Sequence, residues 1–192
     1  MEQNEIYEIF KKSGALLEGH FLLTSGRHSN RYMQCAQVLK YPEYTEKLCK
    51  VIADAYRDSG VELVVGPAMG GILVAYEVAK QLGVPNIFAE RENGKMVLRR
   101  NFSIEKGQKV LVVEDVVTTG GSVLEVINIV KEAGGDLVGA GVLVDRSNGT
   151  VDLGVQLVPV LSMEVVSYDA AECPMCKNGE GEPYKPGSRN LK

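Results

Sequence analysis

The chain has 192 residues, of which 45% are hydrophobic, 24% charged and 6% aromatic, and its formal net charge is -4. This balance is typical of one globular domain of ordinary size with a small appended segment. The acidic charge argues against general nucleic-acid binding, and the longest apolar runs, such as 138–144, are too short to span a membrane.

The start of the chain and its cysteines indicate a compartment. Residues 1–5 are polar and acidic, unlike an export signal, and the cysteines stand at positions 35, 49, 173 and 176. Without an export signal, reduced thiols are the default interpretation. We therefore expect a cytoplasmic protein without nucleic-acid or membrane partners.

The first forty residues predict a small N-terminal hood. Ile6, Ile9 and Phe10 share one face of a helix predicted over 4–12, and Ser13-Gly14 ends that pattern. An apolar stretch at 21–23, a polar turn at 24–30 and an extended run at 31–37 follow, which is typical of a hairpin. We expect the hood to span residues 1–40.

From Pro42 onward, strands, glycine loops and helices alternate. The pattern predicts helices over 42–59, 72–82 and 123–133, and strands over 61–65, 86–89, 109–113 and 137–144. This alternation predicts an α/β core over 41–168, with a mainly parallel twisted sheet flanked by helices. The glycine- and proline-rich tail, 169–192, is expected to be irregular. Ligands of such sheets bind outside the carboxyl ends of the strands.

The segment Val112-Val-Glu-Asp-Val-Val-Thr-Thr-Gly-Gly-Ser122 contains the strongest functional signal. Its last five residues offer hydroxyls and backbone amides at the start of a predicted helix, which is a ready anion site. Glu114 and Asp115 precede this loop, although carboxylates beside a phosphate need another partner. Two vicinal ribose hydroxyls or a cation meet that need. The alternative is a solvated acidic pair followed by an ordinary helix N-cap, and the segment is not a Walker motif.

This segment resembles the signature of the type I phosphoribosyltransferases. The resemblance implies that Glu114 and Asp115 bind the ribose 2′ and 3′ hydroxyls of phosphoribosyl pyrophosphate, and that 118–122 holds its 5′-phosphate. It also implies that Mg²⁺ is bound by the pyrophosphate and ribose oxygens of the substrate, near Asp115. Protein side chains are expected to supply no ligand to this ion. On this segment, the expected phosphoribosyl pyrophosphate contacts are Glu114, Asp115, Val116, Val117, Thr118, Thr119, Gly120, Gly121 and Ser122.

Two further stretches resemble the orotate phosphoribosyltransferases in particular. One is the segment 19–32, with its Ser25-Gly26 turn, and the other is Asp145-Arg146. A planar guanidinium suits the carboxylate of orotate. The resemblance implies orotate contacts from Thr118, Arg146, Ser25 and Gly26. Taken alone, Ser25-Gly26 could be a plain hairpin turn and Arg146 a surface ion pair.

The chain departs from the family pattern at two loops. In Gly66-Pro-Ala-Met-Gly-Gly71, Gly70 stands where the family has a lysine, and Thr24 stands where a second lysine is common. The resemblance also implies a cis peptide near Ala68-Met69. The long mobile basic loop of the family is replaced by the compact 90–100, with a hairpin signal at Asn93-Gly94.

Cations of this short segment are candidates for contact with the departing pyrophosphate. They are Arg91, Lys95, Arg99 and Arg100, and we assign catalytic roles to Arg91 and Lys95 beside Glu114 and Asp115. A solvated charged hairpin is the alternative.

Cys173-Pro-Met-Cys176 resembles half of a zinc site. A second chain, or Cys35 or Cys49, could complete it, but ordinary thiols are favoured. His20 and His28 are interpreted as structural or loop-exposed residues.

Together these features predict an enzyme that transfers phosphoribose to N1 of orotate, giving orotidine monophosphate and pyrophosphate in pyrimidine biosynthesis. The family resemblance implies a homodimer with shared active sites and Mg²⁺ as cofactor. The alternatives are a purine or xanthine phosphoribosyltransferase and a regulator that binds phosphoribosyl pyrophosphate without turnover.

Overall fold

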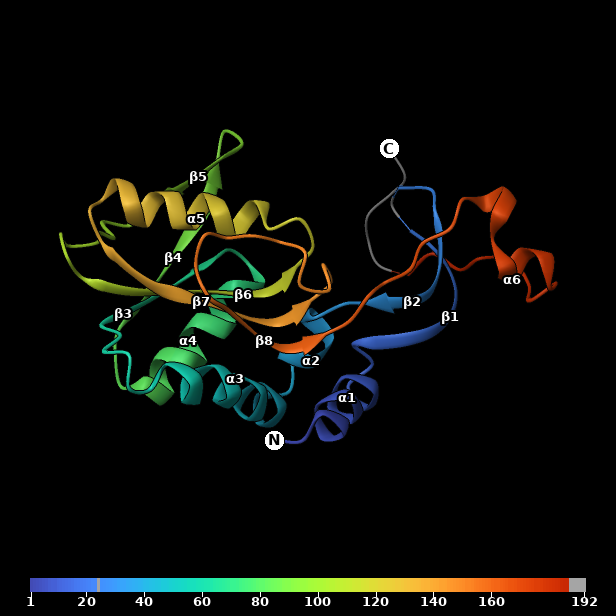
Figure 1. The fold of residues 1–192 in the computed structure, drawn as a ribbon, viewed down its shortest axis with the longest axis horizontal. Coiled ribbons are helices and arrows are strands. Elements are labelled where there is room, and N and C mark those ends of the chain that lie inside the picture. Colours follow the sequence, from blue (N-terminus) through green and yellow to red (C-terminus); the bar gives the residue numbers. More distant parts are fainter. Residues whose placement is uncertain (24, 187–192) are drawn as a thin grey trace.

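The computed structural model describes residues 1–23 and 25–186 and has a core joined to a smaller hood (Figure 1). Thr24 and the end of the expected tail, 187–192, lie outside the described residues.

The core is built on a six-stranded sheet with the order β5-β4-β3-β6-β7-β8. Every neighbouring pair is parallel except β4 and β5, which form a hairpin through Asn93-Gly94. The expected mainly parallel sheet and the expected turn are thus confirmed. The strands are β3 (Leu63–Pro67), β4 (Asn86–Glu92), β5 (Lys95–Leu98), β6 (Lys109–Val117), β7 (Asp136–Asp145) and β8 (Leu157–Ser162).

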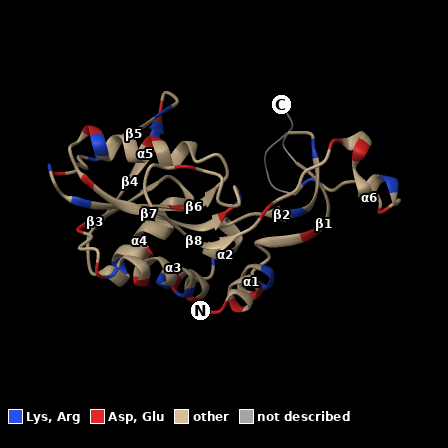
Figure 2. Ribbon diagram, viewed as in Figure 1, with Lys and Arg blue, Asp and Glu red and all other residues tan. Residues whose placement is uncertain are grey.

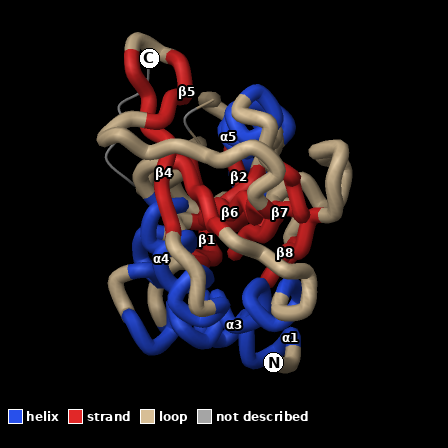
Figure 3. Tube along the Cα trace, turned by 90° about the vertical axis from the view of Figure 1, so that its left-hand side faces the viewer, coloured by secondary structure: helices blue, strands red, loops and turns tan. Residues whose placement is uncertain are grey.

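Helices cover both faces of this sheet (Figure 3). On one face lie α1 (Gln3–Lys12), α3 (Pro42–Tyr56) and α4 (Gly70–Leu82), with the short α2 (Ala36–Leu39) beside them, and on the other lies α5 (Gly121–Glu132). Residues 110–113 of β6 are fully buried between these layers, which explains their unbroken apolar run.

The strand β6 is longer than the sequence predicts, and its carboxyl end extends past its pairing with β3. Its pairing with β3 stops at Val112, whereas its pairing with β7 continues to Val117. Glu114 and Asp115 therefore lie within the strand rather than beyond it. After β3 the chain turns to one side of the sheet, and after β6 to the other, so the carboxyl ends of these neighbouring strands form a topological switch point.

In the structure the hood is the N-terminal hairpin together with the tail, whereas α1 and α2 of the predicted segment 1–40 pack on the core. Strands β1 (Leu16–Leu22) and β2 (His28–Met33) are antiparallel, and the tail contributes the 3-10 helix η1 (Ala170–Glu172) and α6 (Pro174–Lys177). Bridges between Phe21 and Tyr184 and between His28 and Tyr168 join the two parts. The tail expected to be irregular is thus partly ordered, because distant residues of the hairpin pair with it.

Acidic and basic residues are interspersed over the ribbon (Figure 2). Among the described residues, the helices are all too short or too polar to cross a bilayer.

Candidate active site

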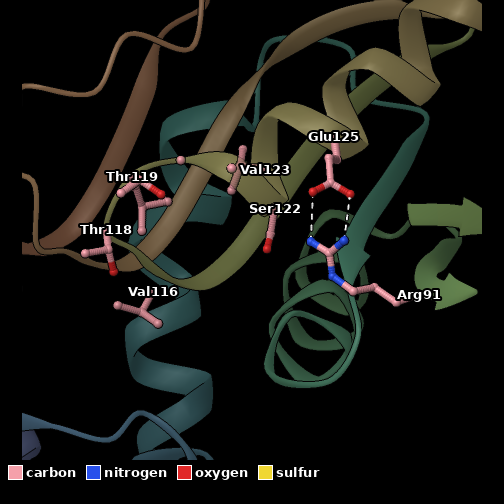
Figure 4. Close-up of a pocket in the computed structure, with 10 residues that line it drawn as sticks. Arg91, Val116, Thr118, Thr119, Ser122, Val123 and Glu125 are labelled. Carbon is pink, nitrogen blue, oxygen red and sulfur yellow. Dashed lines mark hydrogen bonds and ion pairs between the residues drawn. The ribbon is translucent and has the colours of Figure 1, made fainter. Parts of the chain in front are cut away.

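A cavity of about 320 Å³ lies at the carboxyl end of β6, around the start of α5 (Figure 4). It is lined by Arg91, Val116, Val117, Thr118, Thr119, Gly120, Gly121, Ser122, Val123 and Glu125. Helix α5 begins at Gly121 without a side-chain cap, so its first amides remain available to an acceptor. Free amides at a helix N-terminus bind anions, and Thr118, Thr119 and Ser122 add hydroxyl donors.

The turn into α5 requires glycine at position 120. Gly120 has φ +79°, and a Cβ there would lie 2.7 Å from Val151 Cγ1. A larger residue would therefore strain the backbone and displace the loop. The sequence predicts only that the glycines of this loop let the backbone approach a phosphate closely. It does not predict the contact with Val151, because the two residues are far apart in the chain.

The predicted acidic pair precedes this loop, with Glu114 buried and Asp115 partly buried. Glu114 is 8% exposed, and its Oε1 accepts the backbone amide of Asp115 at 3.0 Å. Burial and the neighbouring Asp115 carboxylate raise the pKa of Glu114 to about 9. Burial also raises the pKa of Asp115. Two desolvated carboxylates favour a partner that donates hydrogen bonds or carries positive charge.

The loop 66–71 packs directly against these carboxylates. A Cβ at Gly70 would collide with the Asp115 side chain, with even the farther oxygen Oδ1 only 2.9 Å away, and one at Gly71 would lie 3.0 Å from Glu114 Oε1. The lysine of the family pattern thus has no room at position 70 while Asp115 keeps this position. The peptide bond between Ala68 and Met69 is cis, as expected.

Arg146 follows β7 at the same edge of the sheet. Its backbone amide donates to Val117 O at 2.8 Å, and its Nε is buried without a hydrogen-bond partner among the described residues. The preceding Asp145 is 2% exposed and braces the turn, because its carboxylate accepts from Ser147 N at 2.8 Å and Gly149 N at 2.9 Å. Sequence reasoning did not single out this bracing role.

The four candidate cations are not all at the cavity. Arg91 lines it and forms a two-point ion pair with Glu125, at 2.8 and 3.0 Å (Figure 4). Lys95 borders a neighbouring hollow. Arg99 pairs with Glu90 and Glu92, and Arg100 with Glu90. Glu125 was missed, since a single acid on a helix gives no signal without its partner.

Ser25 and Gly26 lie at the turn between β1 and β2 and are not among the residues that line this cavity. Their contact with a substrate base therefore stays a prediction. The next residue, Arg27, ties the turn to the tail through Ser167 and Asp169. The Sγ of Cys35 lies 3.6 Å from the carbonyl oxygen of Asp115. The sequence did not predict that Cys35 borders the site.

Comparisons with known proteins give consistent results. A family model described as the phosphoribosyl transferase domain matches residues 35–153. The orotate phosphoribosyltransferases of Desulforamulus reducens and Pelotomaculum thermopropionicum are 60% and 61% identical over 191 residues, covering 100% of each chain. The crystal structure of orotate phosphoribosyltransferase from Aeropyrum pernix matches with a TM-score of 0.70 and 28% identity, covering 92% of this chain and 99% of that one.

Proposed function

The chain belongs to the orotate phosphoribosyltransferases, with the type I phosphoribosyltransferase fold, and from that premise we propose how its residues divide the reaction. The substrates are phosphoribosyl pyrophosphate and orotate, and the products are orotidine monophosphate and pyrophosphate. The observation that carries the proposal is the uncapped start of α5, which follows the buried Glu114 and the partly buried Asp115 on β6. One strand thereby presents a phosphate site and a ribose site side by side.

The 5′-phosphate belongs at the loop 118–122. Amides at the start of α5 and the hydroxyls of Thr118, Thr119 and Ser122 line the cavity there. Both the hydrogen-bond donors and the helix dipole favour a dianion.

The ribose hydroxyls belong at Glu114 and Asp115. Hydroxyl donors would replace the water that burial removes from these carboxylates, so that binding favours their ionised forms. Carboxylate oxygens are also ligands that suit Mg²⁺, which is bound through few carboxylates together with substrate phosphates. When bound near Asp115, the ion would supply positive charge to the pyrophosphate.

The base belongs between Thr118 and Arg146. Arg146 supports this placement, because its Nε has no hydrogen-bond partner among the described residues and its guanidinium would pair with a carboxylate such as that of orotate. Asp145 acts as a positioning residue by holding the turn from which Arg146 projects.

Arg91 is the cation best placed for pyrophosphate, since it borders the phosphate loop. Its ion pair with Glu125 is half-exposed, so the pair holds the guanidinium at the cavity at little energetic cost. Lys95, Arg99 and Arg100 remain candidates that would have to leave their present positions.

The reaction needs no protein nucleophile. The C1′–oxygen bond to pyrophosphate breaks, the C1′–N1 bond to orotate forms, and the N1 proton leaves the base. The carboxylates fix the ribose, the loop fixes the phosphate, and cations offset the charge that develops on pyrophosphate.

We also propose that the enzyme is a homodimer. Met69, Leu73 and Tyr76 form an exposed apolar stripe at helical spacing, with Met69 at the N-cap of α4 and the other two on the helix. Such stripes mark protein interfaces. Sedimentation should show that Tyr76→Asp shifts the protein toward monomer, whereas the control Val166→Asp, also exposed, leaves it unchanged. A dimer retained in Tyr76→Asp would contradict this interface.

The free thiols support a cytoplasmic location.

The substrate assignment is tested by assay with Mg²⁺ and phosphoribosyl pyrophosphate against orotate, xanthine or adenine. Turnover of orotate alone supports the proposal. Turnover of a purine without orotate would favour the purine enzyme, and binding without turnover would favour a regulator.

Arg146→Ala tests the orotate site within that assay. Loss of a charged hydrogen-bonded pair costs about 1.5–3 kcal/mol, so KM for orotate should rise roughly 10- to 100-fold. KM for phosphoribosyl pyrophosphate should change little, as should both constants in the control Arg57→Ala, which removes a surface ion pair on α3. An equal loss for both substrates would contradict the assigned role.

A further inference from the structure

The hood contains a cluster of four metal-ligating side chains away from the phosphate cavity. His20 lies on β1 and His28 on β2. Cys173 directly precedes α6, and Cys176 lies within that helix. One ligand atom from each residue lies within 4.8 Å of all the others. His20, His28 and Cys173 are buried and Cys176 is exposed, so the cluster sits just under the surface of the hood.

The four printed separations of these atoms lie within about 0.3 Å of those expected around one zinc ion. With Zn–S near 2.3 Å and Zn–N near 2.0–2.1 Å, tetrahedral geometry puts sulfur and nitrogen about 3.6 Å apart and two nitrogens about 3.3 Å apart. His20 Nε2 lies 3.6 Å from the Sγ of both cysteines. His28 Nδ1 lies 3.3 Å from Cys176 Sγ and 3.0 Å from His20 Nε2.

The ring of His20 is also oriented as a metal ligand. Its Nδ1 lies 2.9 Å from the carbonyl oxygen of Gly181, and only a protonated Nδ1 can donate to that oxygen. The Nε2 lone pair then faces the two sulfurs and His28. A backbone carbonyl on the outer nitrogen is the usual support of a metal-bound histidine.

The hood is a part of the molecule that benefits from such a link. It consists of a two-stranded hairpin and two one-turn helices, and a lone hairpin is marginally stable in water. The other contacts between the hairpin and the segment after β8 include two backbone bridges, the contacts of Arg27 and the hydrogen bond from Ser29 Oγ to Val166 O. Small units with little apolar core commonly rely on a metal or disulfides.

We propose that His20, His28, Cys173 and Cys176 bind one Zn²⁺ in a closed tetrahedral site that fastens the C-terminal tail to the β1–β2 hairpin. Four protein ligands leave no open position, so the site is structural. Two thiolates and two neutral imidazoles balance the charge of the ion, and the two thiol protons leave as it binds. This pairing replaces Cys35 and Cys49, the partners considered from sequence, which belong to the core.

The direct test is the metal content of the full-length chain, purified without a histidine tag under reducing conditions with zinc supplied. Elemental analysis should find one zinc per chain in the wild type and in the control Cys49→Ala, a buried cysteine on α3. Cys176→Ser and His28→Ala should retain less than a tenth of that amount. Equal zinc in the wild type and Cys176→Ser would overturn the assignment.

A second measurement does not depend on the folding of any variant. Cobalt added to the metal-free wild type should give the intense visible bands of tetrahedral coordination with sulfur-to-cobalt charge transfer. Absence of these bands, or a Cys173–Cys176 disulfide that persists under reductant, would overturn the proposal. Both outcomes are independent of transferase turnover, since the cluster shares no residue with the phosphate cavity.

Discussion

Replacing Gly70 with alanine probes the contact that places Asp115. The added Cβ would lie 2.9 Å from Asp115 Oδ1 and nearer still to the other carboxylate oxygen, whereas ordinary contact begins at 3.4 Å. The carboxylate must therefore move by at least the 0.5 Å between these two values, and by more on its nearer side. Its short side chain leaves few positions in which it can still meet a ribose hydroxyl.

A misplacement of about 1 Å at a reacting site costs about 10²-fold. We expect kcat/KM for phosphoribosyl pyrophosphate to fall between 10- and 100-fold in Gly70→Ala, measured in steady-state assays with saturating orotate. Lys80→Ala, which trims a half-exposed side chain on the same helix, should leave kcat/KM within twofold.

A double-mutant cycle identifies the cause. In an Asp115→Ala background the added methyl has no carboxylate to displace, so Gly70→Ala should cost little further activity. If the two substitutions reduce kcat/KM independently, the steric argument is wrong and Gly70 acts on the loop by another route.

Four further substitutions follow from the site. Folding raises the pKa of Glu114 from 4.5 to about 9, so the folded state binds more protons and the wild type loses stability as pH rises through that window. Glu114→Gln should therefore raise Tm at pH 8 and by less at pH 5 in calorimetry, and a Tm lowered at pH 8 would refute this. Gly120→Ala, at φ +79° and against Val151, should weaken phosphoribosyl pyrophosphate binding at least tenfold by titration calorimetry, and unchanged affinity would show that the loop adapts. Glu125→Ala should change unfolding free energy by no more than about 1 kcal/mol, because the Arg91 pair is half-exposed, while Arg91→Ala should raise KM for phosphoribosyl pyrophosphate. Identical kinetics of Arg91→Ala and wild type would remove Arg91 from the site.

Local patterns in the sequence account for much of the site. The run from Val112 to Ser122 carries its strand, acids and phosphate loop within one continuous segment, so periodicity and residue type suffice to predict it. The alternation of strands and helices likewise predicts the core, because each unit is completed by its neighbours in the chain.

Contacts between distant segments escaped prediction. The ion pair of Arg91 with Glu125 and the exclusion of a side chain at Gly70 each depend on how separate elements meet. The length of β6 depends on its pairing with β7, which no local signal in 114–117 reports. For the same reason the Cys-Pro-Met-Cys motif suggested cysteine partners, whereas the fold brings two histidines of the hairpin to it.

The joining of the hairpin to the tail also bears on how the chain is made. Cys173 meets His20 across 153 positions of sequence, so the hairpin leaves the ribosome long before its partner exists. The core between them can fold first, because its strands and helices are contiguous in the chain. The hood is then completed last, as a contact of high sequence separation that closes over an already folded unit. Truncation or an interrupted synthesis near residue 170 would accordingly leave a folded core with an open hairpin edge.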